Sequence, residues 1–241
     1  MAGKSAFVTV GTTKFDGLVE AVDTPSFAGA LMQQGFTKLT VQAGRGLYEP
    51  RRLLTAASTP GPVRDNSDSQ DVDRREAILL PADVEDGSNL APKDHVESLH
   101  VVFFAYSPNL AAHVAEADLV VSHAGAGSAF EALSAGKPLI VVPNPTLMHN
   151  HQVELAEELQ RRGHAVATTA EDLVGALERL AATKLVPYAG GDVSGLARVV
   201  AGAVSPGKGH RAAEGLLAAA VYCFGAVIAG LIAHELVRGI R

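Results

Sequence analysis

Residues 118–142 read DLVVSHAGAGSAFEALSAGKPLIVV, and this stretch decides the fold class. It contains two short apolar runs, 118–122 and 138–142, of the kind that forms buried strands of a parallel sheet. A glycine-containing turn between them leads into a helix-like segment at 128–135. Strand, turn, helix and strand in this order predict one βαβ unit.

The same alternation continues on both sides of this unit. Further strands are predicted at 6–10, 39–43, 99–104 and 165–167, and further helices within 18–35 and at 109–117, 151–162 and 170–184, the last with Thr169 as its N-cap. Strands that alternate with helices favour a parallel sheet covered on both faces. The sequence therefore predicts an α/β fold with a doubly wound, Rossmann-like parallel sheet.

Residues 58–98 have a different character, because Pro, Gly, Ser and Asp dominate and apolar residues cluster only at 77–80. We interpret them as a flexible acidic insertion, too poor in apolar side chains to offset the entropy of ordering. Within it, Asp71-Val72-Asp73 has the D-x-D form of a metal- and nucleotide-sugar-binding motif of some glycosyltransferases. A charged, solvated loop is the interpretation we favour for these three residues.

The carboxyl-terminal part is expected to lie outside the sheet domain. We predict a domain at 1–204, a linker at 205–214 and a hydrophobic helix at 215–237, in which residues 215–233 carry no charge. As a helix, these 19 residues would be roughly 28 Å long, close to the ~30 Å of a bilayer core. A membrane anchor is predicted, and a helix packed against protein is the alternative.

Composition excludes two classes of function. The chain has 241 residues, a net charge of -6 and one cysteine, Cys223. A lone cysteine excludes a disulfide scaffold, and the absence of a Lys and Arg stripe argues against a nucleic-acid partner.

Three loops that follow predicted strands contain the candidate site, because ligands of such sheets bind outside the carboxyl ends of the strands. They are residues 11–13, 122–128 and 144–152. In the second loop, Gly125 and Gly127 let the backbone approach a ligand, and the following helix start favours phosphate. Since Phe130 occupies the third position of a G-x-G-x-x-G pattern, dinucleotide binding is disfavoured.

Two other chemistries fit these loops less well. Ser128 beside His123 lacks the G-x-S-x-G context of a hydrolase, and His123, Ser128 and Glu131 lie within nine residues, unlike a catalytic triad. His149 and His151 have no evident acidic or cysteine partner, so we predict no metal. A polar ligand-binding loop is the better interpretation.

Three stretches of the sequence, at 123–131, 136–138 (Gly-Lys-Pro) and 150–152, resemble the nucleotide-sugar signature in the C-terminal half of GT-B glycosyltransferases of the family 28 type. Residues 10–12, 15–16, 42–45, 122–128, 150–152 and 184–187 more narrowly resemble the Alg13 family of UDP-N-acetylglucosamine transferase subunits. The similarity covers roughly residues 6–204.

This resemblance implies a GT-B half-domain that binds UDP-N-acetylglucosamine (UDP-GlcNAc) and transfers the sugar, with inversion, to the 4-hydroxyl of a lipid-linked GlcNAc acceptor. The step would add the second GlcNAc to GlcNAc-PP-dolichol, the precursor of N-glycans. An Alg14-like membrane-anchored subunit would supply the missing half, and no cofactor is expected. The implied location is the cytosolic face of the endoplasmic reticulum, with the cytosol as a second location. A non-catalytic nucleotide-sugar-binding regulatory or scaffold subunit is the alternative.

The resemblance also implies roles for particular residues. Glu131 would accept hydrogen bonds from the ribose hydroxyls, and the N–H groups of residues 125–128 with the Ser128 hydroxyl would bind the phosphates. His123 would contact the pyrophosphate, and Asn150 and Gln152 the sugar hydroxyls. The predicted substrate-binding set is Gly11, Thr12, His123, Gly125, Gly127, Ser128, Glu131, Asn150 and Gln152. No residue can be identified as the general base. Arg45 is either a support for its loop or a surface charge. The helix predicted at 192–204 is the candidate partner-docking element.

Overall fold

The computed structural model describes residues 3–57, 59–60, 71–84, 98–146 and 151–190. The chain divides into two compact units, 1–187 and 188–241, and every helix and strand described below lies in the first. The predicted docking helix, the linker and the hydrophobic helix therefore lie outside the described residues, as do Asn150 and most of the predicted insertion.

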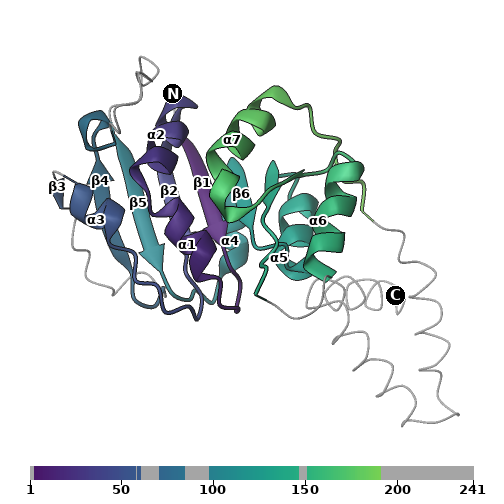
Figure 1. Cartoon of the computed structure of the whole chain (residues 1–241), viewed down its shortest axis with the longest axis horizontal. Coiled ribbons are helices and arrows are strands. Elements are labelled where there is room, and N and C mark those ends of the chain that lie inside the picture. The colour runs from purple at the N-terminus through teal and green to yellow at the C-terminus, as the bar shows by residue number, and fades with distance from the viewer. Residues whose placement is uncertain (1–2, 58, 61–70, 85–97, 147–150, 191–241) are drawn as a thin grey trace, which may run out of the picture. The chain divides into compact units, whose positions relative to one another are not determined.

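The described residues form eight strands and seven α-helices (Figure 1). The strands are β1 (Lys4–Thr9), β2 (Phe36–Gln42), β3 (Thr59–Pro60), β4 (Arg75–Leu79), β5 (Leu99–Phe104), β6 (Leu119–Ser122), β7 (Leu139–Val141) and β8 (Val166–Ala167). The α-helices are α1 (Asp16–Val22), α2 (Pro25–Gln33), α3 (Arg52–Ala56), α4 (Leu110–Glu116), α5 (Ala126–Ser134), α6 (His151–Arg161) and α7 (Leu173–Ala182), with two 3-10 turns at Pro81–Asp83 and Ala170–Asp172.

All eight strands form one sheet, in the order β3-β4-β5-β2-β1-β6-β7-β8. The six strands from β5 to β8 in this order are parallel. In Figure 1, α1, α2 and α3 lie in front of the sheet and α4 and α5 behind it. The predicted doubly wound α/β fold is confirmed, and the strand order reverses between β1 and β6, where such folds bind ligands.

Two expectations were wrong at the β3–β4 end of the sheet. β4 pairs antiparallel with both β5 and β3, so the sheet is mixed rather than wholly parallel. Part of the predicted insertion is therefore a strand of the sheet, in which Ala77 and Leu79 lie on the same face and bury their side chains.

Asp71 differs from expectation too. Its carboxylate is buried and paired with Arg74, at 2.9 Å, and with His113, at 3.4 Å. The interpretation of residues 71–73 as a solvated loop was therefore wrong for Asp71, whereas Asp73 is exposed.

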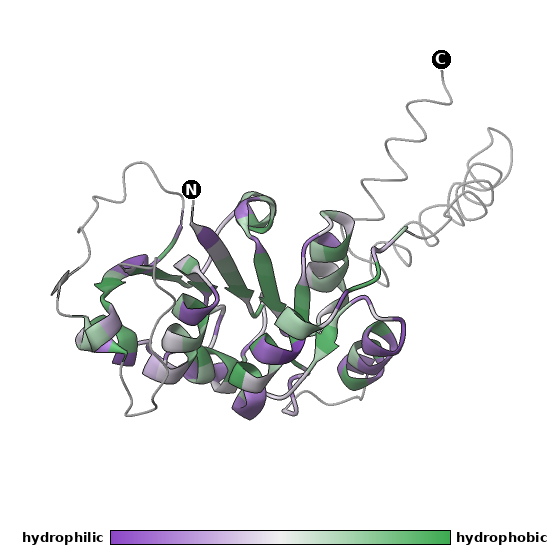
Figure 2. Ribbon diagram, turned by 90° about the horizontal axis from the view of Figure 1, so that it is seen from above, coloured by the Kyte–Doolittle hydropathy of each residue, from purple (hydrophilic) through white to green (hydrophobic). Residues whose placement is uncertain are grey.

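The segment between β1 and β2 forms two helices, because α2 has its own start signal. Thr24 is its N-cap and accepts a hydrogen bond from Phe27 N at 3.3 Å, and Pro25 occupies the first helical position. Apolar strands lie between helices whose outer faces are polar (Figure 2). None of the helices in the described part of the chain is long and apolar enough to cross a bilayer.

Candidate functional site

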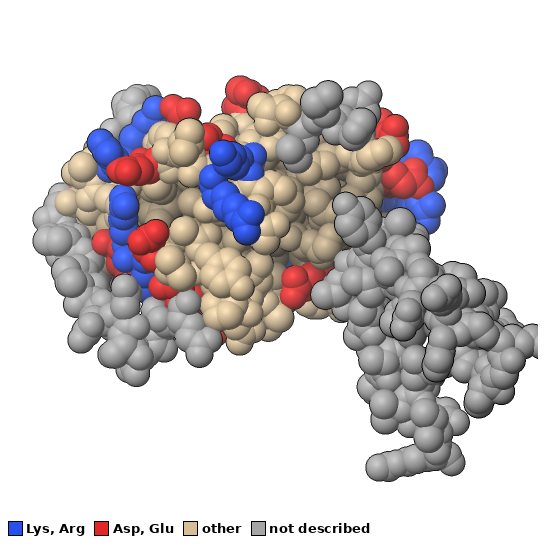
Figure 3. Space-filling view, turned by 90° about the horizontal axis from the view of Figure 1, so that it is seen from below, with Lys and Arg blue, Asp and Glu red and all other residues tan. Residues whose placement is uncertain are grey.

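The loops after β1, β6 and β7 are joined at the point where the strand order reverses. His123 N donates to the Thr9 carbonyl at 3.2 Å, linking the β6 loop to the end of β1. Asn144 Nδ2 donates to the Lys14 carbonyl at 2.8 Å, linking the β7 loop to the β1 loop. Figure 3 looks onto this edge of the sheet and shows Lys and Arg atoms near its centre, surrounded mostly by uncharged surface. The loops after β6 and β7 are therefore each bonded to the segment that follows β1.

The imidazole of His123 lies against two glycines from different loops. A Cβ atom added to Gly125 would come within 2.2 Å of His123 Nε2, and one added to Gly11 within 2.7 Å of His123 Cε1. Gly11 also has a φ of +62°, which side chains other than glycine rarely adopt. Both predicted glycines are thus required by the close approach of their backbone to His123.

His123 is only 5% exposed, and burial lowers its pKa below 6.5. The ring is therefore neutral at pH 7. Its Nδ1 atom has no hydrogen-bond partner in the described part of the chain, and neither does Oγ of the preceding residue, Ser122. Buried polar atoms are almost always hydrogen-bonded in folded proteins, so these two atoms are candidates for ligand or water contacts.

The turn into α5 is the most strained backbone of the site. Ala124 has a φ of +57° although it is not a glycine, and Gly125 then adopts the extended N-cap conformation. The first helical bond runs from Ala129 N to the Gly125 carbonyl at 3.0 Å. The N–H groups of residues 126–128 consequently have no partner within the helix, and the helix dipole adds partial positive charge there.

The predicted ligand residues on α5 lie at this end of the helix. Gly127 is exposed, and a Cβ atom added there would have nothing within 4 Å. Ser128 is half-buried, and Glu131 lies three residues further along the helix. Burial raises the pKa of Glu131, and its carboxylate takes part in none of the hydrogen bonds or ion pairs found among the described residues. The carboxylate is thus free to accept hydrogen bonds from a ligand.

A buried polar network supports the β1 loop from below. Thr9 Oγ1 donates to Gln42 Oε1, and Gln42 Nε2 donates to the Gly11 carbonyl at 2.8 Å. Gly11 N in turn donates to Thr9 Oγ1 at 3.0 Å. Thr9 and Gln42 are each 1% exposed. These two residues were not predicted as part of the site, although a polar residue at the end of a buried strand is a recognisable signal.

Asn144 is a third residue that the sequence reasoning did not select. It is 3% exposed, and its Oδ1 accepts from Thr146 N at 3.0 Å and Thr146 Oγ1 at 2.8 Å. Gln152, which was predicted to contact sugar hydroxyls, uses its Oε1 to accept from Asn144 N at 2.9 Å. Gln152 is therefore left with its amide N–H groups for a ligand.

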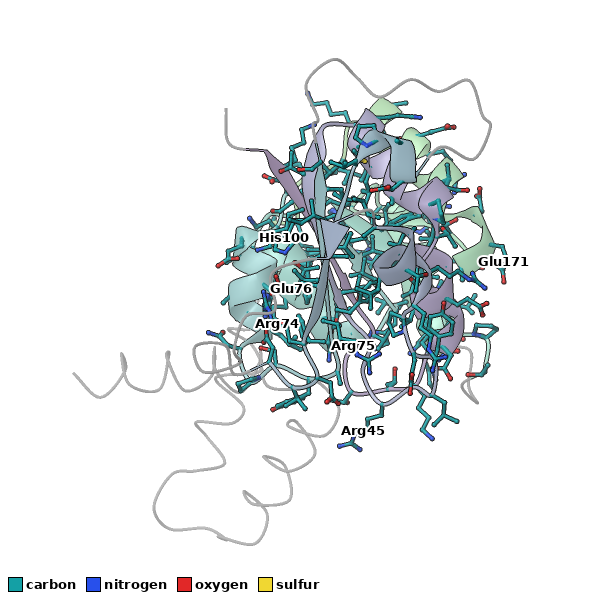
Figure 4. All side chains as sticks on the ribbon, turned by 90° about the vertical axis from the view of Figure 1, so that its left-hand side faces the viewer. Arg45, Arg74, Arg75, Glu76, His100 and Glu171 are labelled. Atoms are coloured by element: carbon teal, nitrogen blue, oxygen red, sulfur yellow. The ribbon has the colours of Figure 1, made fainter. Side chains whose placement is uncertain are left out.

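Two predicted or open positions are at the surface. Thr12 is exposed in the β1 loop. Arg45 is exposed too; its backbone N donates to the Thr13 carbonyl at 3.2 Å, while its side chain points away from the domain (Figure 4). Arg45 thus joins the two loops through its backbone and is a surface charge through its side chain.

No group of three or more His, Cys, Asp or Glu side chains in the described part of the chain could hold a metal ion. That the site works without a metal stays a prediction. The N–H groups at the start of α5 and the helix dipole offer a diphosphate partial positive charge without a metal.

Comparison with known proteins gives one consistent family. The model of the glycosyltransferase family 28 C-terminal domain matches residues 81–200. UDP-N-acetylglucosamine transferase subunit ALG13 of Candida glabrata is 39% identical over 189 residues, which cover 76% of this chain and 90% of that protein. Its human counterpart is 35% identical over 67% of this chain, but this match covers only 11% of the human protein.

Among solved structures, an NMR structure of ALG13 matches with a TM-score of 0.55 at 28% identity, covering 82% of this chain and 94% of the other. The agreement in sequence and fold thus extends over most of the chain. The protein belongs to the ALG13 family of UDP-N-acetylglucosamine transferase subunits.

Proposed function

We propose that this chain is the donor-binding catalytic subunit of the UDP-GlcNAc transferase that adds the second GlcNAc to GlcNAc-PP-dolichol. The observation that carries the proposal is the turn from β6 into α5, where free N–H groups, the neutral His123 and the unpaired Glu131 carboxylate lie together at the reversal of the strand order. The relatives are named UDP-N-acetylglucosamine transferase subunits, which agrees with a UDP-sugar donor.

Each group has a distinct task in this proposal. The N–H groups of residues 126–128 and the Ser128 hydroxyl bind the two phosphates, and the Glu131 carboxylate accepts hydrogen bonds from the ribose hydroxyls. His123 contacts the diphosphate, and the amide group of Gln152 donates to a sugar hydroxyl. These contacts hold the donor and stabilise the negative charge that develops on the leaving UDP.

The reaction is an inverting displacement. The 4-hydroxyl oxygen of the acceptor sugar forms a bond to C1 of the donor sugar as the bond from C1 to the UDP oxygen breaks, and the hydroxyl proton passes to a base. The sequence identifies no residue of this chain as that base. We therefore assign acceptor binding and the base to an Alg14-like, membrane-anchored partner.

We also propose a location on the cytosolic face of the endoplasmic reticulum. The uncharged residues 215–233 would bind the membrane as a helix, and small residues at four-residue spacing (Gly225, Ala229 and Ala233) would pack against a partner helix. A cytosolic pool of the chain is compatible with this proposal, because the predicted anchor is only marginally long enough to span a bilayer.

Two experiments test the proposed function. Calorimetric titration with UDP and UDP-GlcNAc should give saturable binding to the full chain, with GDP-mannose as a control that does not bind. Transfer from labelled UDP-GlcNAc to a lipid-linked GlcNAc acceptor should then require co-expression of the partner. Binding with no transfer under any of these conditions supports the alternative of a regulatory or scaffold subunit, whereas transfer by the isolated chain overturns the need for a partner.

A further inference from the structure

Three large apolar side chains are exposed at the same edge of the sheet as the donor loops. Leu47, in the loop after β2, is 82% exposed; Tyr106, after β5, is 51% exposed; and Val72, before β4, is 50% exposed. They are three of the six large hydrophobic side chains that are exposed among the described residues. We call Leu47, Val72 and Tyr106 the apolar rim.

The segments that carry the rim are neighbours. Val72 N donates to the Tyr106 carbonyl at 2.8 Å, and Ala105 N donates to the Val72 carbonyl at 2.9 Å. Gly44 N donates to the Ala105 carbonyl at 3.1 Å, joining the β2 loop to the same strand end. The rim therefore lies along one continuous border and not at scattered points of the surface.

Two carboxylates hold the Leu47 loop in place. Asp16 Oδ1 accepts from Leu47 N at 2.8 Å and from Tyr48 N at 3.0 Å. Asp23, which is fully buried, accepts from the Tyr48 hydroxyl at 2.8 Å and from the backbone N of Arg51, Arg52 and Leu53 at 2.8 to 3.0 Å. Burial and the Asp23 bond raise the pKa of Tyr48 to about 12, so this hydroxyl remains a donor. Leu47 is thus exposed on a loop that is fixed before any partner arrives.

A second charge network holds the Val72 segment. Asp71 pairs with Arg74 and His113, while Arg74 also pairs with Glu76 at 2.5 Å and Glu76 with His100 at 2.8 Å. Figure 4 shows Arg74, Glu76 and His100 in a row along one side of the sheet. Burial opposes ionisation of Glu76, but hydrogen bonds from Arg74 and His100 outweigh it and lower its pKa. This ion-paired network fixes the backbone on both sides of Val72.

Single exposed apolar side chains are ordinary. Three at one edge of the sheet, on preorganised segments, favour a binding surface, because a fixed surface loses little entropy when a partner covers it. The charges nearby are of both signs: Arg45 and Arg75 are exposed, and so are Glu49 and Asp73. An anionic membrane surface attracts segments that are rich in Lys and Arg and carry few carboxylates. Mixed charges around an apolar centre are instead typical of a protein interface.

We propose that the apolar rim is part of the surface on which the partner subunit docks, and that it receives an apolar patch bordered by both carboxylates and cations. This inference rests on the proposed function and adds the location of the contact. Arg45, beside the rim, is bonded through its backbone to Thr13 in the β1 loop, so a partner on the rim borders the donor site directly. A subunit seated there is in position to present an acceptor hydroxyl to the bound donor.

The test uses the full chain with Leu47→Glu alone and with Leu47→Glu and Tyr106→Glu together. Leu80→Glu is the matched control, because Leu80 is 39% exposed and follows the end of β4 that is distant from the donor loops. We expect the affinity for the co-purified partner to fall at least about tenfold in the single variant and further in the double variant. UDP binding and the unfolding temperature should stay unchanged in all three variants, and the Leu80→Glu chain should bind the partner normally.

The outcomes separate this inference from the proposed function. If the unmodified chain does not bind UDP, or does not capture the partner, the proposed function itself is contradicted. Normal partner capture by the double variant overturns the rim alone. If the double variant keeps its partner but no longer floats with vesicles of phosphatidylcholine and phosphatidylserine, the rim is a membrane-binding surface. If it keeps its partner but no longer self-associates in ultracentrifugation, the rim binds a second copy of this chain. Both results overturn the proposal.

Discussion

Gly125 is close enough to His123 that its missing side chain determines where the imidazole lies. The 2.2 Å between a Cβ atom added at Gly125 and His123 Nε2 is less than any normal contact, whereas a Cβ atom added to Gly127, two residues later, meets nothing within 4 Å. The two glycines of the same turn therefore differ: Gly125 is required for the packing of the histidine, whereas Gly127 faces open space at the start of the helix.

This difference predicts opposite effects of two similar substitutions. Gly125→Ala should displace His123 and lower the free energy of unfolding by about 1–3 kcal/mol, with loss of UDP binding. Gly127→Ala should leave stability unchanged or raise it by up to about 1 kcal/mol. Urea unfolding of both variants measures this, and equal destabilisation of the two would contradict the predicted packing.

Glu131→Ala should weaken UDP binding by roughly 10- to 150-fold, because hydrogen bonds to a charged group contribute about 1.5–3 kcal/mol. The unfolding temperature at pH 7 should not fall, since burial already disfavours the ionised carboxylate. Glu178→Ala, at an exposed position of α7, is the control and should bind UDP normally. Unchanged affinity of a properly folded Glu131→Ala chain removes Glu131 from the site.

His123 should make the stability of the ligand-free protein depend on pH. Burial lowers its pKa in the folded state below 6.5, so the unfolded chain binds the proton more readily. The stabilisation is complete above about pH 6.5 and is lost as the pH falls through the folded-state pKa. The slope of unfolding temperature against pH in this window should decrease in His123→Gln. Equal slopes in wild type and His123→Gln would show that His123 is not desolvated.

Asp23 should be among the most sensitive positions for stability. Asp23→Ala leaves three backbone N–H groups and the Tyr48 hydroxyl without their acceptor, and should cost about 3–5 kcal/mol in the free energy of unfolding. Tyr48→Phe removes only one of these bonds and should cost about 1 kcal/mol. Urea denaturation of both variants measures the difference, and similar losses would mean that the backbone bonds to Asp23 contribute little.

Truncation after Val204 should release the chain from membranes in cells that lack the partner. The reason is that residues 215–233 carry no charge and include eight strongly apolar side chains, which contribute roughly -2 to -5 kcal/mol to insertion. Carbonate extraction of full-length and truncated chains measures the effect. Full-length protein found wholly in the soluble fraction would refute the anchor.

The sequence was sufficient for the α/β class and for the parallel core, because strands such as 99–104 and 118–122 are mostly apolar and alternate with helices. It was insufficient for β4, whose five residues combine Arg75 and Glu76 with only three apolar residues. Arg75 stays exposed, whereas Glu76 pairs with Arg74 and with His100. The pair with His100 joins residues distant in sequence and leaves no local pattern.

For the candidate site, the glycines and the helix start could be recognised from local spacing. The roles of the supports could not, although Thr9 and Gln42 are recognisable as polar residues at the ends of buried strands, because Thr9, Gln42 and Asn144 act through contacts with residues distant in sequence. Arg45 could not be assigned either, since its role is divided between a backbone bond and an exposed side chain.

The strands at the two ends of the sheet order, β3 and β8, are only two residues long. A strand this short offers few backbone N–H and C=O groups to another chain, and Pro60 in β3 has no N–H to offer at all. The long parallel strands are thereby protected from aggregation through edge-to-edge pairing. For the proposed subunit, this means that an unassembled copy offers its neighbours little backbone for strand pairing at either end of the sheet.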